Sequence, residues 1–328
     1  MMAEDSNTPN LALPTDNDAL FHGGGPEFYQ YIIRNFQGDK SNPWQGGQYG
    51  FVRDPVPTSS GLVYTRFHEG IDIKPVRRDA QGEPLDEVRA IADGVVVHAN
   101  LVAGYSNYGR YVVVEHRWDG SDYYSLYGHL ASISVEKGAK VARGQQLGIM
   151  GHTGTGLDRE RAHVHLELNL LLGRHFESWY EHFVPNDPNH HGNFNGLNLT
   201  GIDIARYYLA QRKQPGLSVP RFLANEETFY KVTLPATKSF DLPQRYPWLL
   251  RKNSDGSPPS WEVSFSRSGI PLEVVPSVKA VEGPVLSYVD KREGNYSQLT
   301  RGVLTGSARN AHLSENGERA MRLLIWPD

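Results

Sequence analysis

RAHVHLEL, residues 161–168, places two histidines two positions apart in an otherwise apolar run. Its length and its Val and Leu residues favour a β-strand, in which alternate side chains point to the same face. His163 and His165 would therefore share one face. An isolated pair of this kind is common on half-exposed strands, so the rest of the chain has to decide whether the two rings carry chemistry.

The composition bounds the possible functions. A chain of 328 residues suggests about two domains with enough material for a hydrophobic core. With 21% charged residues and a formal net charge of −4, it has no general attraction for nucleic acid or membranes, and we expect no nucleic-acid partner. The absence of cysteine excludes disulfides, thiolate zinc sites and a cysteine nucleophile. Any metal must therefore be held by His, Asp or Glu.

Short β-branched and aromatic runs, bounded by many of the 33 Gly and 21 Pro, predict a mainly β fold with antiparallel sheets. We expect four parts: an N-terminal extension packed on the next domain, a compact β domain, a loop and helix connection, and a second β-rich module. Their boundaries are 1–50, 51–172, 173–215 and 216–328. No stretch predicts a membrane span, and the sequence does not predict the oligomeric state.

Several segments of the sequence are expected to form particular helices and strands. A short helix is expected around 26–36 and a longer one in DIARYYLAQR, 203–212. The expected strands of the second module are FYKVTLPA (229–236), WEVSFS (261–266), LEVVPS (272–277) and RLLIW (322–326).

Two further pieces of the β domain can join the histidine pair in one site. RFHEGIDI, 66–73, holds His68 and Asp72 four residues apart, with Gly70 between them to let the backbone turn. YYSLYGHL, 123–130, ends near His129. If His68, Asp72 and one histidine of 161–168 meet, they make three protein ligands with an open fourth position, the pattern of a catalytic zinc site.

Together, HEGID, YGHL and HVH resemble in order and spacing the signature of the lysostaphin-type (LytM-like) zinc metallopeptidases, which cut peptide bonds in bacterial cell-wall cross-links. The runs AIADGVVVHA, YGRYVVVEH and VEKGAKVARGQQLGIMGHTG extend the resemblance over about 51–172. It implies a β-sheet metallopeptidase domain with Zn²⁺ bound by His68, Asp72 and His165. It also implies that His129 and His163 are the catalytic pair, one a general base and both able to stabilise the oxyanion.

The resemblance implies a zinc endopeptidase whose substrate is a peptidoglycan stem or cross-bridge peptide. The alternative is a catalytically silent LytM-like module that binds or regulates cell-wall hydrolases, although all five key residues are present. The Gly-spaced VEKGAKVARGQQLGIMG also has the rhythm of biotinyl and lipoyl carriers, but lacks their lysine context. The polar start MMAEDSNTPN has no apolar signal segment. We nevertheless expect an extracytoplasmic protein whose leader is not part of this sequence.

Expectations for other residues depend on strand alternation and on departures from the family pattern. Glu167 shares the face of His165 and either supports it or lies on the surface. A charged loop, 158–161, replaces the usual turn before HVH and should border the cleft, and Arg110 stands where many members have Asn. The expected substrate contacts are Tyr127, Arg110 and His152, with packing as the alternative for Tyr127.

The remaining histidines are expected to be structural. His98 and His116 fall near the ends of expected strands. His190 and His191 look like a second metal pair, but adjacent residues point in different directions, which favours a solvated loop.

Overall fold

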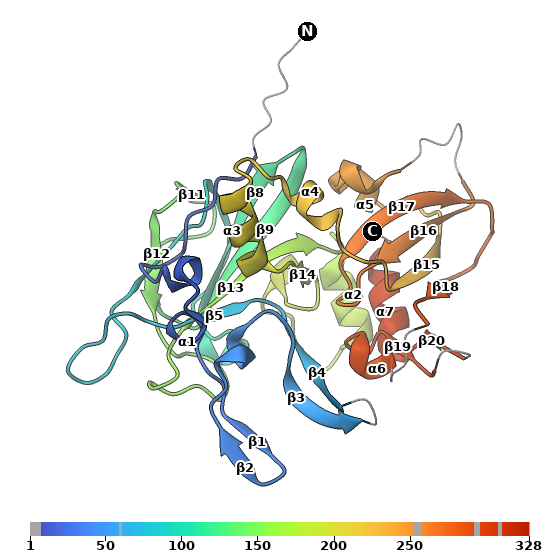
Figure 1. Cartoon of the computed structure of the whole chain (residues 1–328). Helices are drawn as coiled ribbons and strands as arrows, with labels where there is room; N and C mark the ends of the chain where they lie inside the picture. Colours follow the sequence, from blue (N-terminus) through green and yellow to red (C-terminus); the bar gives the residue numbers. More distant parts are fainter. Residues whose placement is uncertain (1–7, 59–60, 252–257, 292–295, 308–309, 328) are drawn as a thin grey trace. The chain divides into compact units, whose positions relative to one another are not determined.

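The computed structural model describes residues 8–58, 61–251, 258–291, 296–307 and 310–327 (Figure 1). Most of the polar start discussed above, residues 1–7, lies outside this range. Contacts divide the chain into two compact units, Met1–Asn169 with Gly201–Ser218, and Leu170–Thr200 with Val219–Asp328. The four-part division expected from the sequence remains a prediction. Within the described residues, no helix has the length and apolar character needed to cross a membrane.

The first unit is built mostly from strands. They are β1 (Arg34–Phe36), β2 (Asp39–Ser41), β3 (Gly50–Thr58), β4 (Gly61–His68), β5 (Ile71–Ile73), β6 (Glu87–Arg89), β7 (Gly94–Asn100), β8 (Tyr111–Trp118), β9 (Ser121–Gly128), β10 (Leu130–Ile133), β11 (Lys140–Val141), β12 (Gln146–Met150) and β13 (Val164–Leu171). The helical segments are η1 (Ala19–His22), α1 (Gly25–Phe28), η2 (Trp44–Gly47), η3 (Ala103–Tyr105) and α3 (Ile204–Lys213).

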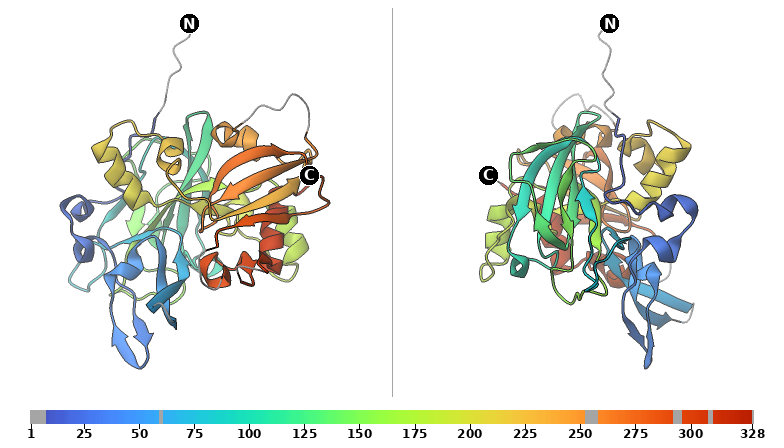
Figure 2. Two further views of the ribbon diagram at one scale, coloured as in Figure 1. Left: turned by 45° about the vertical axis from the view of Figure 1, so that its right-hand side comes forward. Right: turned by 90° about the vertical axis from the view of Figure 1, so that its left-hand side faces the viewer.

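The main sheet runs in the order β11-β7-β8-β9-β13-β14, where β14 is Leu199–Gly201, and β5 also pairs with β13. The right-hand view of Figure 2 shows its strands side by side. Its pairings β11–β7, β7–β8, β8–β9, β9–β13 and β13–β5 are antiparallel. The smaller sheets are β10-β12-β6 and the hairpins β3–β4 and β1–β2. The predicted mainly β, antiparallel fold is confirmed.

Strand β13, which begins directly after His163 and contains His165, is buried along its whole length. One face carries Val164, Leu166 and Leu168, which are 0% exposed, and packs in the apolar core. The other face carries His165 and Glu167, which are 5% and 1% exposed. A buried polar face is costly unless its groups are paired, so this face needs partners of its own.

The N-terminal part packs on the sheet through backbone hydrogen bonds, as expected. Gln30 N–H donates to Asp72 O at 2.8 Å, and Lys74 N–H donates to Phe28 O at 3.0 Å. The helix expected around 26–36 is wrong beyond Phe28, because the next residues pair with the β5 segment instead of continuing α1. Tertiary pairing has overridden local helix propensity here.

The second unit contains a sheet ordered β17-β16-β15-β18, drawn from yellow-orange to red in Figure 1. Its strands are β15 (Tyr230–Pro235), β16 (Ser260–Phe265), β17 (Pro271–Ser277), β18 (Val285–Val289), β19 (Leu304–Thr305) and β20 (His312–Leu313). Its helical segments are α2 (Phe176–Phe183), η4 (Gly192–Phe194), α4 (Val219–Leu223), α5 (Leu242–Arg245), η5 (Pro247–Leu249), α6 (Tyr296–Leu299) and α7 (Glu315–Leu323).

The strand predicted for RLLIW, 322–326, is wrong. Helix α7 runs into this segment, and Ser314 caps it by accepting a hydrogen bond from Gly317 N–H at 2.9 Å. Its Leu323 joins a buried cluster with Phe176 and Trp179 of α2. A short apolar run has the same appearance in a strand and in a buried helix end, so the pattern alone did not distinguish them.

His116 confirms its expected structural role. His98 in β7 and His116 in β8 both lie two residues before the end of their strand, as expected. The His116 ring is fully buried, Nδ1 donates to Asp93 O at 2.8 Å, and Nε2 lies 2.7 Å from Ser125 Oγ. Burial lowers the pKa of His116 to about 4, although the hydrogen bond to Asp93 acts in the opposite direction. The folded state therefore holds a neutral ring near pH 7.

This gives the first prediction. The unfolded chain protonates His116 near pH 6.5 and the folded chain only near pH 4, so its contribution to stability is complete above pH 6.5 and is lost as the pH falls towards 4. The free energy of unfolding of wild type and of His116→Gln is measured with urea in a chelating buffer at each pH. The difference between the two proteins should shrink by about 2–3 kcal/mol as the pH falls from 7 to 4.5. A difference that does not change with pH would contradict the assignment.

A second prediction concerns Gly70. A Cβ at this position would lie 2.3 Å from the carbonyl oxygen of Leu166 in β13, so only glycine fits beside the strand. Gly70→Ala should destabilise the protein by about 1–3 kcal/mol through overpacking, measured by urea unfolding. Gly104→Ala is the matched control, because a Cβ there meets nothing within 4 Å. Equal stability of both variants would show that the close approach is unimportant.

Candidate metal centre

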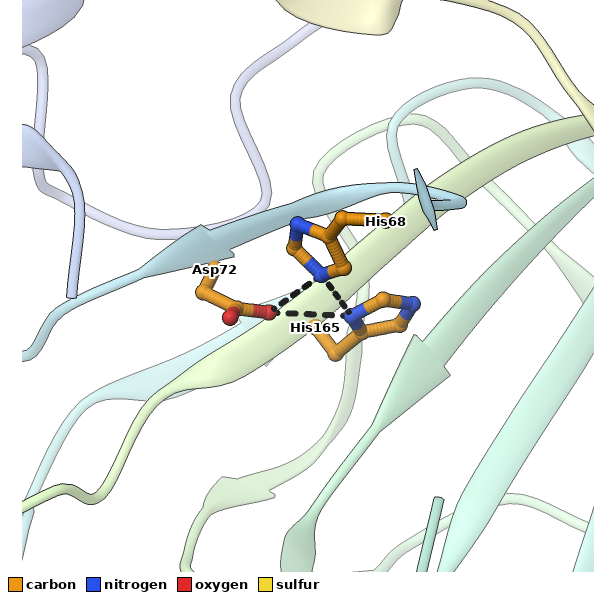
Figure 3. Close-up of side chains that lie close together, drawn as sticks. All are labelled: His68, Asp72 and His165. Atoms are coloured by element: carbon orange, nitrogen blue, oxygen red, sulfur yellow. Dashed lines mark hydrogen bonds and ion pairs between the residues drawn. The ribbon is translucent and has the colours of Figure 1, made fainter. Parts of the chain in front are cut away.

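Three side chains of the first unit point their ligand atoms at one another (Figure 3). His68 Nε2 lies 3.1 Å from His165 Nδ1 and 3.0 Å from Asp72 Oδ1, and His165 Nδ1 lies 2.9 Å from the same oxygen. All three residues are buried, with 2–5% exposure. His68 ends β4, while Asp72 on β5 is directly paired with His165 on β13.

The second nitrogen of each ring is fixed by a hydrogen bond. His68 Nδ1 donates to Gln48 O at 2.8 Å, and His165 Nε2 donates to Glu167 Oε1 at 2.8 Å. Because a carbonyl only accepts, the neutral His68 ring carries its lone pair on Nε2. The neutral His165 ring likewise carries its lone pair on Nδ1. Both lone pairs then face Asp72 Oδ1, the arrangement typical of imidazole ligands with supporting hydrogen bonds.

Burial and the charges of neighbouring groups shift the pKa values of the three residues in different directions. Burial lowers the pKa of His68, and the nearby charge of Asp72 only partly opposes this. Burial also acts to lower the pKa of His165, but hydrogen bonds to Asp72 and Glu167 outweigh it and raise the value to about 10. For Asp72, burial acts to raise the pKa, yet the charges around it, first those of His68 and His163, hold it well below its usual range.

The donor set fits zinc. A tetrahedral site with ligand distances of about 2.0–2.1 Å separates neighbouring ligand atoms by about 3.3 Å, and the three separations found here are 2.9–3.1 Å. Two imidazole nitrogens and one carboxylate oxygen match the chemistry of Zn²⁺, and three protein ligands leave a position open. Among the described residues, this is the group of His, Asp and Glu side chains with metal-binding geometry.

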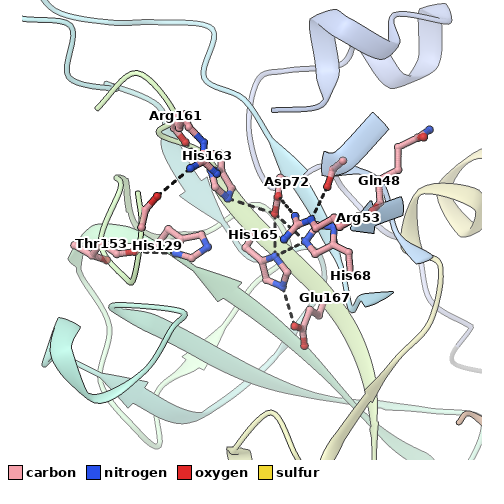
Figure 4. A network of polar contacts seen from close by, with 12 residues as sticks. Gln48, Arg53, His68, Asp72, His129, Thr153, Arg161, His163, His165 and Glu167 are labelled. Atoms are coloured by element: carbon pink, nitrogen blue, oxygen red, sulfur yellow. Dashed lines mark hydrogen bonds and ion pairs between the residues drawn. The ribbon is translucent and has the colours of Figure 1, made fainter. Parts of the chain in front are cut away.

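His129 and His163 lie beside this triad (Figure 4). Their ring centroids are 4.7 Å apart, and His129 is 5.9 Å from the His165 ring. His163 Nδ1 donates to Arg161 O at 2.7 Å, and its Nε2 is 3.3 Å from Asp72 Oδ1. The structure thus brings together the five residues that the sequence singled out for metal binding and catalysis.

The backbone and surroundings of His129 are unusual. Its φ of 63° is in the left-handed region, which non-glycine residues seldom adopt and which often marks functional positions. Its Nδ1 donates to Thr153 O at 2.8 Å, which leaves the lone pair of the neutral ring on Nε2. Burial, together with the charges of His163 and His165, holds the pKa of His129 well below its ordinary value. The ring is therefore neutral near pH 7, with its lone pair on Nε2.

Glu167 supports His165, and the alternative expectation that it lies on the surface is wrong. It is 1% exposed and accepts hydrogen bonds from Tyr108 Oη at 2.8 Å and Asn169 Nδ2 at 2.8 Å, besides that from His165. Burial and the charge of Glu167 raise the pKa of Tyr108 well above its usual range, so Tyr108 remains a donor. The carboxylate is thereby fixed against His165.

The three residues expected to contact substrate each make contacts with other parts of the first unit. Tyr127 pairs with Leu166, so its side chain lies on the face of the sheet opposite to that of His165, and it is 0% exposed. Tyr127 therefore packs in the core, as the alternative expectation for it stated. Arg110 donates to the carbonyl oxygens of Leu101 and Ala131 at 3.2 and 3.1 Å. His152 Nε2 lies 3.1 Å from Glu83 Oε2. Substrate contacts by Arg110 and His152 stay predictions.

The charged loop 158–161 borders an open groove of about 710 Å³. The groove is lined by Arg78, Gly82, His152, Leu157, Asp158, Arg159 and Glu160. Arg78 holds the loop by donating to the carbonyl oxygens of Arg159 and Glu160 at 2.7 and 3.1 Å. Since Arg161 O accepts from His163, the loop also fixes the orientation of that ring.

The sequence did not predict three supporting residues of the centre or the burial of His191. Gln48, Arg53 and Tyr108 contact the centre from outside the quoted motifs, although Tyr108 begins the run YGRYVVVEH. His190 is exposed as expected for a solvated loop, but His191 is 7% exposed, so that expectation is wrong for His191.

Residues 66–177 match Peptidase family M23. This segment is therefore an M23 domain, and the lysostaphin-type, LytM-like resemblance is confirmed. The N-terminal extension and most of the second unit lie outside the match.

Two curated relatives share short segments with this chain. It is 44% identical over 84 residues, 25% of its length, to peptidoglycan DD-endopeptidase ShyA of Vibrio cholerae serotype O1, and covers 17% of that protein. It is 44% identical over 68 residues, 21% of its length, to murein hydrolase activator EnvC of Escherichia coli K12, and covers 15% of that protein. The matched segments thus span less than a fifth of either relative.

Among solved structures, the catalytic domain of the antimicrobial peptidase lysostaphin from Staphylococcus simulans is 26% identical. The match covers 38% of this chain and 82% of that chain, with a TM-score of 0.25.

Proposed function

We propose that this protein is a zinc-dependent endopeptidase that hydrolyses peptide bonds in peptidoglycan. The observation that carries the proposal is the convergence of His68 Nε2, Asp72 Oδ1 and His165 Nδ1 within 2.9–3.1 Å, with two further histidines beside them. The M23 match over 66–177 supports the reaction class. In this proposal His68, Asp72 and His165 hold the metal, and His129 and His163 are the catalytic pair.

Bound zinc supplies an activated water and polarises the carbonyl oxygen of the scissile bond. The protein supplies the proton acceptors. His163 and His129 each use Nδ1 to donate to a backbone carbonyl, so each neutral ring presents the Nε2 lone pair. One ring takes a proton at Nε2 as general base. A ring that has been protonated becomes a donor, which can stabilise the oxyanion or transfer the proton to the leaving amine.

The substrate class is proposed from the relatives. ShyA is named a peptidoglycan DD-endopeptidase, and its matched segment shares 44% identity with this chain. A stem or cross-bridge peptide of peptidoglycan is therefore the proposed substrate, which requires an extracytoplasmic location. The electrostatic character of the chain agrees with a peptide substrate, since its net charge of −4 provides no general affinity for polyanions.

A silent regulatory module is the second candidate, because EnvC is named a murein hydrolase activator and also shares 44% identity over its match. This candidate predicts that loss of the histidines leaves the biological effect unchanged. The complete set of five residues in one place favours the enzyme.

The proposal first predicts separable roles for His163 and His165. His165→Ala should lose zinc, because one of three ligands is removed, whereas His163→Ala should retain about one zinc per chain and lose most turnover. Zinc content after dialysis, together with peptide cleavage, measures both. Equal loss of zinc in the two variants would mean that the roles have been divided wrongly.

The hydrogen bond from His165 to Glu167 yields another prediction. Glu167→Gln keeps the side-chain shape but removes the charge that supports the ring, so zinc affinity should fall by about 10–100-fold in chelator competition. Glu136→Gln is the control, because Glu136 is exposed in the same unit. An unchanged affinity for Glu167→Gln would contradict the supporting role.

The function itself is tested on purified peptidoglycan. Wild-type protein loaded with zinc should release fragments whose masses identify a cleaved peptide bond. His163→Ala should release far fewer, and chelated wild type none. No fragments from zinc-loaded wild type, or equal release by His163→Ala, would overturn the enzyme proposal.

A further inference from the structure

Arg53 of β3 makes a fixed contact with the candidate metal ligand Asp72. Its Nη2 donates to Asp72 Oδ2 at 2.6 Å, and its Nε donates to the backbone oxygen of Gly46 at 2.8 Å. The two side chains are 20% and 6% exposed, so this ion pair is largely shielded from water. The guanidinium is thus held at two points and cannot rotate away from the carboxylate without losing both bonds.

The backbone of the hairpin aims Arg53 at the centre. β3 and β4 pair Gly50 with His68 and Phe51 with Phe67, and then Arg53 with Arg66, so Val52 is an inserted bulge residue. Without the bulge, Arg53 would occupy the strand position on the other face, because side chains alternate. Bulges commonly redirect a side chain next to a functional site.

The irregular backbone around the bulge is supported by further contacts. The carbonyl oxygen of Val52 accepts a hydrogen bond from Arg34 Nη2 at 3.1 Å, and Asp54 adopts a left-handed φ of 52°. Such a conformation is unfavourable for a non-glycine residue and persists where the surroundings determine it. The chain therefore maintains two local irregularities that flank Arg53 and place its guanidinium on Asp72.

We propose that Arg53 is a positioning residue that keeps Asp72 as a one-oxygen ligand. This inference rests on the proposed zinc site. A free carboxylate can bind a cation through one or both oxygens. Here Oδ2 is engaged by the guanidinium, while Oδ1 faces the two histidine nitrogens. The division of the two oxygens preserves a three-ligand set and leaves room for water and substrate.

The geometry requires arginine rather than any cation. Nε and Nη2 belong to one rigid planar fork, and they bond Gly46 O and Asp72 Oδ2 simultaneously. A lysine ammonium is a single point charge at the end of a flexible chain. Arg53→Lys should therefore keep the positive charge beside Asp72 but lose the fixed orientation.

The test uses the full chain with Arg53→Met and Arg53→Lys, and with Arg66→Met as the matched control. Arg66 is the cross-strand partner of Arg53, but its side chain is 67% exposed and lies 4.0 Å from Asp54 rather than on Asp72. Zinc affinity is measured by chelator competition. Co²⁺ is the coordination probe, because its visible absorption is stronger in four-coordinate than in five- or six-coordinate sites. Circular dichroism establishes that each variant is folded.

For Arg53→Met we expect a zinc dissociation constant raised about 10–100-fold, as for other residues that orient metal ligands. The Co²⁺ absorption should weaken as Asp72 Oδ2 becomes available to the metal, and kcat should fall while KM is unchanged. Arg53→Lys should recover part of the affinity and little of the Co²⁺ absorption. If Arg53→Met fails to fold, Arg53→Lys alone decides through its Co²⁺ spectrum. Arg66→Met should match wild type throughout.

The inference would be overturned if folded Arg53→Met had the zinc affinity and Co²⁺ absorption of wild type. If only Arg53→Lys folds, the same result for that variant would overturn it. A change confined to KM would also overturn it, since Arg53 would then act on substrate. Both outcomes leave the proposed function standing if wild type binds zinc and cleaves peptidoglycan. Failure of wild type to bind zinc or Co²⁺ would instead remove the metal site on which the inference depends.

Discussion

The direct pairing of His165 on β13 with Asp72 on β5 determines where the rest of the centre can lie. Two residues separated by 93 positions in sequence are brought opposite one another by strand register, and their ligand atoms stand 2.9 Å apart. His163 then follows on the same face of the chain by alternation. A slip of one residue would turn both histidines to the apolar face, so the register and the chemistry are inseparable.

This pairing places polar groups where burial is costly. The cost is met by a continuous series of partners, in which Arg53 contacts Asp72, Asp72 faces His165, and His165 donates to Glu167. Tyr108 and Asn169 complete the series by donating to the Glu167 carboxylate. A network in which each buried charge has a partner favours one arrangement of side chains, whereas removal of a single member leaves a buried charge unpaired.

Strand alternation was enough to predict the strands of the β domain, because sequence displays local periodicity directly. Alternation left either histidine of 161–168 open as the partner of His68 and Asp72, and the choice of His165 came from the resemblance to the lysostaphin-type family. The contributions of Arg53 and Gln48 could not be found in this way, because a β-bulge and a backbone carbonyl provide them. Burial of Glu167 was also undecided, since alternation gives its face but not what covers that face.

Zinc-edge anomalous diffraction from crystals of the zinc-loaded full chain tests the central claim most directly. We predict a single strong peak within about 2.0–2.2 Å of His68 Nε2, Asp72 Oδ1 and His165 Nδ1. The peak should not contact His129 or His163. A zinc peak elsewhere, or a metal-loaded structure in which the three side chains lie far apart, would contradict the account.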